Sequence, residues 1–167
     1  MRQSMKQLAP MFSTARMVRE YADRFYMPSN HAFYALQENG CARAKEALAW
    51  RKRVRDAWPN VAIRSVTDTA HAQHVTGDEL TITATVELGS LTPSDVKVQA
   101  IVGTVGPNRD LVDTQVYEMA DKGNGVFDAT LPCCDPGNHG YVCRIVPHHE
   151  DVRVATELPL VSWQNVS

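Results

Sequence analysis

The spacing of apolar residues, which changes near position 60, is the feature that most constrains the fold. Before that point apolar residues recur at the three- and four-residue intervals of an amphipathic helix. Residues 80–88 instead alternate between apolar and polar without a miss, which is typical of a half-buried antiparallel strand. The change predicts an α+β chain with a helical segment over residues 1–60 and a β domain over residues 61–167.

The helical segment is predicted to contain three helices. The first begins at Ser13 or Thr14, whose hydroxyl can cap it, and ends at Pro28. The second covers about residues 30–38 and ends at the Asn-Gly pair that follows. The third runs over residues 42–58 and ends at Pro59.

The second segment is predicted to be an antiparallel β-sandwich of immunoglobulin-like size. Short strands separated by Gly, Pro and Asn are typical of that architecture. We expect strands over residues 61–66, 80–88, 96–102, 111–119, 126–131, 141–146 and 158–163. Residues 106–108 and 121–125 are predicted turns.

The formal net charge of −2 conceals two halves of opposite sign. Residues 1–60 carry eleven Lys and Arg against five Asp and Glu, a net +6, and residues 61–167 carry a net −8. The contrast supports two units that attract each other. Basic helices could also bind nucleic acid, but such charges usually form a solvated face, so we expect no nucleic-acid partner. The absence of a long apolar run or a signal-peptide pattern favours no membrane partner and a cytoplasmic location.

Cysteine and histidine gather between positions 133 and 149, which raises the question of a zinc site. The residues are Cys133, Cys134, His139, Cys143, His148 and His149. Adjacent cysteines on a strand point to opposite faces, and no Cys-x-x-Cys pair is present. We therefore expect no metal site and no disulfide, but small buried or loop thiols and a pair of histidines in an exposed turn.

Residues 12–21, Phe-Ser-Thr-Ala-Arg-Met-Val-Arg-Glu-Tyr, carry the most specific pattern of the chain. The segment resembles the last core helix of the bacterial α-glucan (glycogen/maltodextrin) phosphorylases. Residues 39–58 resemble the following helix, and residues 91–96, 140–149 and 160–163 resemble that family's C-terminal β region. The resemblance implies that the chain is the C-terminal part of a two-domain (GT-B) glycosyltransferase, with the rest of that enzyme as its partner.

The same resemblance implies a reaction and a cofactor for the parent enzyme. Phosphorylases of this family transfer a glucosyl unit from the end of an α-1,4-glucan to phosphate, giving glucose 1-phosphate, with pyridoxal phosphate held on a lysine. Lys6 lies in Ser-Met-Lys-Gln-Leu, which is not the cofactor motif. We therefore expect no catalytic residue, no cofactor-binding residue and no activity in this chain alone.

Two other functions remain open. Aromatic residues could stack on sugar rings and make the sandwich a glucan-binding module; the candidates are Trp50, Trp58, Tyr117, Tyr141 and Trp163. Trp50 and Trp58 lie eight residues apart on one predicted helix, which fits packing against the sandwich better than an open platform. Alternatively, the sandwich could join subunits without binding sugar.

The first helix presents an apolar face that the resembling enzymes cover with domains outside this chain. The face consists of Met17, Val18, Tyr21 and Phe25. An exposed patch of this kind usually finds a partner. We expect the isolated chain to cover it by self-association, or by folding the helix back on Phe33, Leu36 and the third helix.

Overall fold

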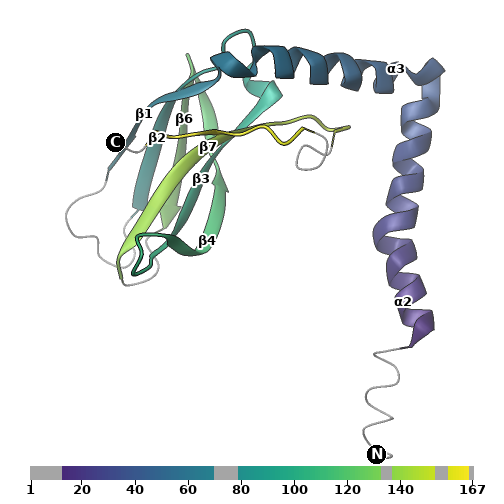
Figure 1. The fold of residues 1–167 in the computed structure, drawn as a ribbon, viewed down its shortest axis with the longest axis horizontal. Helices are drawn as coiled ribbons and strands as arrows, with labels where there is room; N and C mark the ends of the chain where they lie inside the picture. The colour runs from purple at the N-terminus through teal and green to yellow at the C-terminus, as the bar shows by residue number, and fades with distance from the viewer. Residues whose placement is uncertain (1–12, 70–78, 133–136, 153–157, 166–167) are drawn as a thin grey trace, which may run out of the picture. The chain divides into compact units, whose positions relative to one another are not determined.

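The computed structural model of the chain describes residues 13–69, 79–132, 137–152 and 158–165. These residues fall into two compact units, Met1–Leu48 and Ala49–Ser167. The described part of the first unit is helical, and the second contains the last turns of the long helix and all the described strands (Figure 1). No helix in the described ranges is long and apolar enough to cross a membrane.

Helical structure begins where the sequence places it. Ser13 has extended backbone angles and its hydroxyl accepts a hydrogen bond from the Arg16 amide at 3.2 Å, which caps helix α2 (Thr14–Tyr21). A π-helical segment, η1 (Ala22–Tyr26), follows, and then α3 (Met27–Ala57) and the 3-10 turn η2 (Trp58–Asn60). Arg16 also forms an ion pair with Glu20 one turn later, at 2.7 Å.

The prediction of three separate helices is wrong, because helical structure continues from Thr14 past Pro28 without a break. Pro28 lies in the first turn of α3, where its missing N–H costs little, and the π-helical η1 directly before it adjusts the hydrogen-bond ladder. At Glu38–Cys41 the backbone angles are non-helical, so α3 consists of two helical stretches that meet at a kink, where the Asn-Gly pair is predicted to end the second helix. Asn39 and Gly40 have φ of 50° and 65°, conformations that Asn and Gly tolerate best.

In the described residues after Asn60, eight strands follow and pair antiparallel in two sheets. The first sheet has the order β1-β2-β6-β5, with β1 Ala62–Asp68, β2 Glu79–Glu87, β6 Val126–Pro132 and β5 Ala120–Gly123. The second has the order β4-β3-β7-β8, with β4 Leu111–Glu118, β3 Val96–Val105, β7 His139–Pro147 and β8 Ser162–Trp163. If the strands are lettered A, B, C, C′, D, E, F and G in chain order, the sheets are ABED and C′CFG. This is the order of an immunoglobulin-type sandwich with an added C′ strand.

The sandwich core comes from the inward-facing residues of both sheets. Ile82 and Ala84 on β2 alternate with more exposed threonines, as the period-two pattern predicts, and both are 0% exposed. Val98 on β3 and Ile145 on β7 are equally buried. The end of α3 belongs to the same unit, and its buried side chains are Trp50, Val54 and Ala57.

Several predicted strands differ from the structure by one to three residues at an end, and two predictions differ more. The predicted last strand over residues 158–163 is reduced to Ser162–Trp163. The predicted turn over residues 121–125 holds strand β5, which turns into β6 through a stretch of three positive φ angles. Gly125 is required there, because a Cβ at its φ of +74° would lie 2.6 Å from the Val86 carbonyl oxygen.

Candidate functional site: an aspartate anchor and two exposed surfaces

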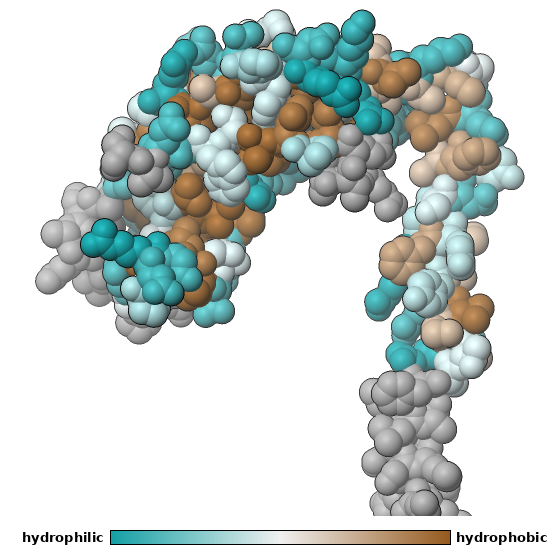
Figure 2. Space-filling view, viewed as in Figure 1, coloured by the Kyte–Doolittle hydropathy of each residue, from teal (hydrophilic) through white to brown (hydrophobic). Residues whose placement is uncertain are grey.

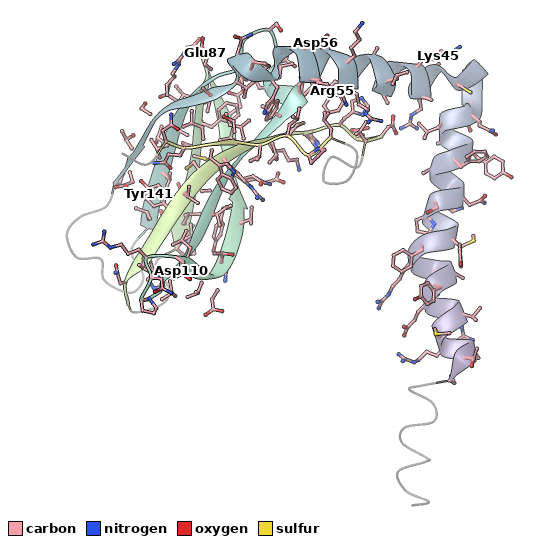
Figure 3. All side chains as sticks on the ribbon, in the orientation of Figure 1. Lys45, Arg55, Asp56, Glu87, Asp110 and Tyr141 are labelled. Atoms are coloured by element: carbon pink, nitrogen blue, oxygen red, sulfur yellow. The ribbon has the colours of Figure 1, made fainter. Side chains whose placement is uncertain are left out.

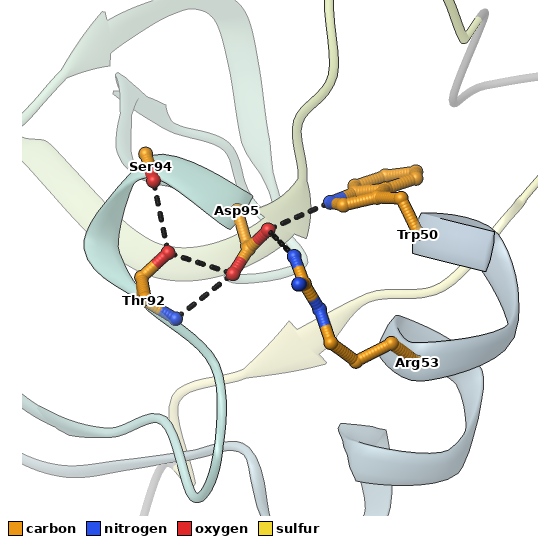
Figure 4. A network of polar contacts seen from close by, with 5 residues as sticks. All are labelled: Trp50, Arg53, Thr92, Ser94 and Asp95. Carbon is orange, nitrogen blue, oxygen red and sulfur yellow. Dashed lines mark hydrogen bonds and ion pairs between the residues drawn. The ribbon is translucent and has the colours of Figure 1, made fainter. Parts of the chain in front are cut away.

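The most connected polar group in the described chain is the carboxylate of Asp95, directly before β3 (Figure 4). Its Oδ2 accepts hydrogen bonds from the Thr92 amide at 2.9 Å and the Thr92 hydroxyl at 2.7 Å. These close a capping box around the 3-10 turn η3 (Pro93–Asp95). Its Oδ1 accepts from the Trp50 indole N–H at 2.8 Å and from Arg53 Nη2 at 2.6 Å. Asp95 thus joins α3 to the second sheet.

The electrostatics of the cluster favour the charged carboxylate. Burial alone would raise the pKa of Asp95, which is only 6% exposed. The hydrogen bonds from Thr92, Trp50 and Arg53 outweigh burial, and the pKa is lowered from its usual 3.8. Each carboxylate oxygen accepts two hydrogen bonds from these neighbours, so the group is suited to holding structure rather than to moving a proton.

His149 lies on the other side of Trp50. The two rings are 4.8 Å apart between centroids, and the Asp151 amide donates to His149 Nδ1 at 3.0 Å. The preceding residue, His148, donates its backbone N–H to the Asp95 carbonyl at 2.8 Å. The sequence predicts an exposed turn for the two histidines, but both are half-buried, and the His149 ring packs against Trp50. We call Trp50, Arg53, Thr92, Asp95 and His149 the Asp95 anchor.

A second polar contact joins the two sheets. The Tyr141 hydroxyl on β7 donates to the Asp68 carboxylate at the end of β1. Burial and the neighbouring carboxylate both raise the pKa of Tyr141. Figure 3 shows Tyr141 and Asp110 toward the end of the sandwich away from Arg55, Asp56 and Glu87. The contact therefore ties the sheets together far from the residues of α3 that flank the anchor.

The first exposed surface is the apolar face of α2 and η1. Its four residues are about half exposed: Met17 52%, Val18 58%, Tyr21 51% and Phe25 56%. Figure 2 shows hydrophobic side chains at the surface of this helix between hydrophilic ones. Phe33 is also 55% exposed, so the helix does not fold back on it in this structure. The face is left open within the described residues.

The second exposed surface lies on β8, where Trp163 is 47% exposed. Of the other aromatic candidates, Trp50 belongs to the Asp95 anchor and Trp58 is half-buried in η2. Tyr117 on β4 donates its hydroxyl to Gln115 at 2.7 Å. Trp163 is thus the candidate with the most open ring among the tryptophans.

The thiols do not form a metal site within the described residues. Cys133 and Cys134 lie outside the described ranges. Cys143 is buried on β7, and burial raises the pKa of its thiol to about 11. Among the described residues, no group of three His, Cys, Asp or Glu side chains is placed to hold a metal ion. The expectation that the chain carries no catalytic residue stays a prediction.

The comparison with known families decides the membership of the chain. Residues 58–165 match the family described as the glycogen phosphorylase C-terminal domain. The chain belongs to this family. The matched range begins at the end of α3 and takes in both sheets and most of the Asp95 anchor.

Relatives of this phosphorylase C-terminal domain extend the match into the helices. The chain is 34% identical over 167 residues to the glycogen phosphorylase of Mycobacterium tuberculosis (strain ATCC 25618 / H37Rv), which covers 96% of this chain and 19% of that protein. It is 27% identical over 177 residues to the maltodextrin phosphorylase of Thermococcus litoralis, covering 98% of this chain and 20% of that protein. The chain therefore spans about a fifth of the length of these curated relatives. It corresponds to the C-terminal part of a phosphorylase.

Proposed function

We propose that this phosphorylase C-terminal domain completes and braces an α-glucan phosphorylase. The parent enzyme would transfer a glucosyl unit from the end of an α-1,4-glucan to inorganic phosphate and release glucose 1-phosphate. Family membership and the two named relatives support the assignment. A cytoplasmic location is part of the same proposal.

The observation that carries the bracing role is the open apolar face of α2 and η1. Full burial of an apolar side chain of this size is worth about 1.5–3 kcal/mol, and four such residues lie half exposed on one segment. The rest of the parent enzyme, about four fifths of the length of the relatives, supplies the natural cover for that face. When the other domains of the enzyme are absent, we expect the isolated chain to bury these residues by self-association.

Pyridoxal phosphate, the cofactor that the family implies, does not fit the residues that the structure describes. A cofactor lysine must sit in an enclosed site, but the described lysines lie at the surface or in ion pairs. Lys45 donates to the Gly40 carbonyl, Lys97 pairs with Glu118, and Lys122 pairs with Asp128. Lys52 is exposed. We assign the cofactor and the chemistry to the part of the enzyme outside this chain.

The test uses a longer enzyme that contains this sequence. We expect the full enzyme to form glucose 1-phosphate from maltodextrin and phosphate, and the 167-residue chain alone to form none. Phe25→Asp and Val18→Asp in the full enzyme should reduce activity and melting temperature together, because they place a charge in the covered face. Tyr34→Asp, at another exposed aromatic position (59% exposed), is the matched control and should change neither.

Two outcomes would contradict the proposal. Release of glucose 1-phosphate by the chain alone would show that the domain carries catalytic groups of its own. A full enzyme whose activity and stability are indifferent to both aspartate substitutions would show that the apolar face is not covered.

A further inference from the structure

The outer face of the second sheet carries a row of four side chains that cross all of its strands. On β3, Val98 is buried and Gln99 is half-buried, so Gln99 points to the outer face. The strand register places Gln99 opposite Glu118 on β4 and opposite Arg144 on β7, and Arg144 opposite Trp163 on β8. We call these four residues the Trp163 row. Three strand spacings make it about 14 Å long.

The row is held in place by its own contacts. Arg144 Nε donates to Gln99 Oε1 at 2.9 Å, and the guanidinium carbon lies 5.6 Å from the centre of the Trp163 ring. The backbone on both sides of Trp163 is fixed as well. Gln164 donates its amide to the Cys143 carbonyl at 2.9 Å, and the Ser162 hydroxyl donates to the Val61 carbonyl at 3.1 Å. Little conformational freedom would be lost when a ligand binds.

The row also keeps unused binding capacity. In the part of the chain that the structure describes, Arg144 donates a hydrogen bond through Nε, and its terminal nitrogens donate none. Glu118 at the far end forms an exposed ion pair with Lys97 at 2.6 Å, with side chains 58% and 34% exposed. The half-exposed Trp163 ring at the near end offers a flat apolar surface.

An open aromatic ring followed by fixed polar groups of both signs suits a neutral, polyhydroxylated chain. The apolar C–H face of a sugar ring can lie on the indole, while hydroxyl groups can both donate to carboxylate or amide oxygen and accept from guanidinium. A charged polymer is not favoured, because the row contains one cation and one anion. The length of the row suits an extended oligosaccharide better than a single ring.

We propose that the Trp163 row binds a segment of α-1,4-glucan outside the catalytic centre of the parent enzyme. The choice of α-glucan rests on the proposed function, since the row itself identifies only the chemical class of the ligand. Bound there, a branched or long glucan stays close to the enzyme between catalytic events, which raises its effective concentration.

The test is native electrophoresis of the 167-residue chain through gels that contain amylopectin, with dextran gels as the linkage control. We expect retardation by amylopectin and not by dextran. Trp163→Ala and Arg144→Gln should each weaken binding about tenfold. Val116→Ala, on the exposed edge strand of the same sheet (50% exposed), should bind like the wild type. Thermal melts verify that each variant is folded.

Fluorescence supplies a second readout that does not depend on a disruptive substitution. Titration with maltoheptaose should change the tryptophan emission of the wild type, and the change should vanish in Trp163→Phe, because Trp163 lies in the row and is the most exposed of the three tryptophans. Absence of retardation, or equal retardation of wild type and Trp163→Ala, would overturn the inference.

The failure of this inference is distinguishable from failure of the proposed function. If the full enzyme forms glucose 1-phosphate but the 167-residue chain does not bind amylopectin, only the glucan site at the Trp163 row is rejected. If Trp163→Ala leaves glucan binding unchanged but weakens assembly of the parent enzyme, the row is a protein contact and the inference is wrong.

Discussion

Apolar side chains are largely exposed in the helical segment up to Leu48 and largely buried in the compact unit that follows it. In the compact unit, Ile82, Val98 and Ile145 are at most 1% exposed. In the helix, Val18 and Phe25 are more than half exposed, although their spacing is as regular as that of the strands. Regular apolar spacing therefore predicts which face of an element can be buried. It does not predict whether other residues of this chain bury that face.

The largest contrast between the two regions should appear in thiol reactivity. Cys41 is exposed in the kink of α3, and Cys143 is fully buried on β7. We expect Cys41 to react with a disulfide reagent as a free thiol does. Cys143 should react at least about a thousandfold more slowly, because the reagent reaches it only when the sandwich unfolds and because burial raises the pKa of its thiol.

The rates are measured in a Cys133→Ser/Cys134→Ser background, with Cys41→Ser and Cys143→Ser to assign each phase. Equal rates for the two thiols under native conditions would show that the sandwich is not a stable core.

Substitution in the core should cost far more than substitution in the helix. Ile82→Ala leaves a cavity between the sheets and should lower the free energy of unfolding by about 2–5 kcal/mol. Val18→Ala removes a side chain that is 58% exposed and should change it by less than about 0.5 kcal/mol. Urea unfolding of the 167-residue chain, followed by tryptophan fluorescence, measures both. If Val18→Ala lowered the free energy of unfolding as much as Ile82→Ala, the two regions would not differ in how far they bury their apolar residues.

The Asp95 anchor should give a smaller, pH-dependent effect. Asp95→Asn replaces an acceptor with a donor that faces Thr92 or Arg53, and should cost about 1–3 kcal/mol near neutral pH. The pKa of Asp95 is lowered on folding, so its contribution is present above pH 3.8 and is lost as the pH falls through the folded pKa.

The wild type should therefore lose more stability than Asp95→Asn on acidification from about pH 5 to pH 3. If the free energy of unfolding falls equally with pH in the two proteins, ionised Asp95 does not stabilise the fold. Arg53→Ala is the comparison for the partly exposed ion pair and should cost less than Asp95→Asn, since its side chain is 57% exposed.

The smallest effect on stability, and the sharpest effect on assembly, is expected on the helix face. Val18→Asp and Phe25→Asp should leave unfolding of the compact unit within about 0.5 kcal/mol and should lower self-association of the isolated chain. Sedimentation equilibrium gives the mass. A chain that is monomeric, with neither variant changing its mass or melting temperature, would show that the face is not buried by a second copy.

The sequence predicted those features that depend on neighbours along the chain. The alternation over residues 80–88 located β2, and Ser13 located the start of α2. The continuation past Pro28 was missed, because it depends on a π-helical turn that leaves no spacing signal. The Asp95 anchor was missed as well, since Trp50 and Arg53 lie 45 and 42 residues away from Asp95. The Thr-Pro-Ser-Asp run at residues 92–95 was the local signal available, as a capping box.

The Asp95 anchor determines which residues must be transferred together if this domain is fused to another protein. The matched family range begins at residue 58, but the compact unit begins at Ala49, and the buried Trp50, Val54 and Ala57 lie between them. A gene fusion that transferred the sheets alone would leave Asp95 without its indole and guanidinium donors. A transferred sandwich would keep these contacts only if the final turns of α3 moved with it. Recombination within the Ala49–Ala57 stretch is therefore expected to be selected against, even though every strand would survive it.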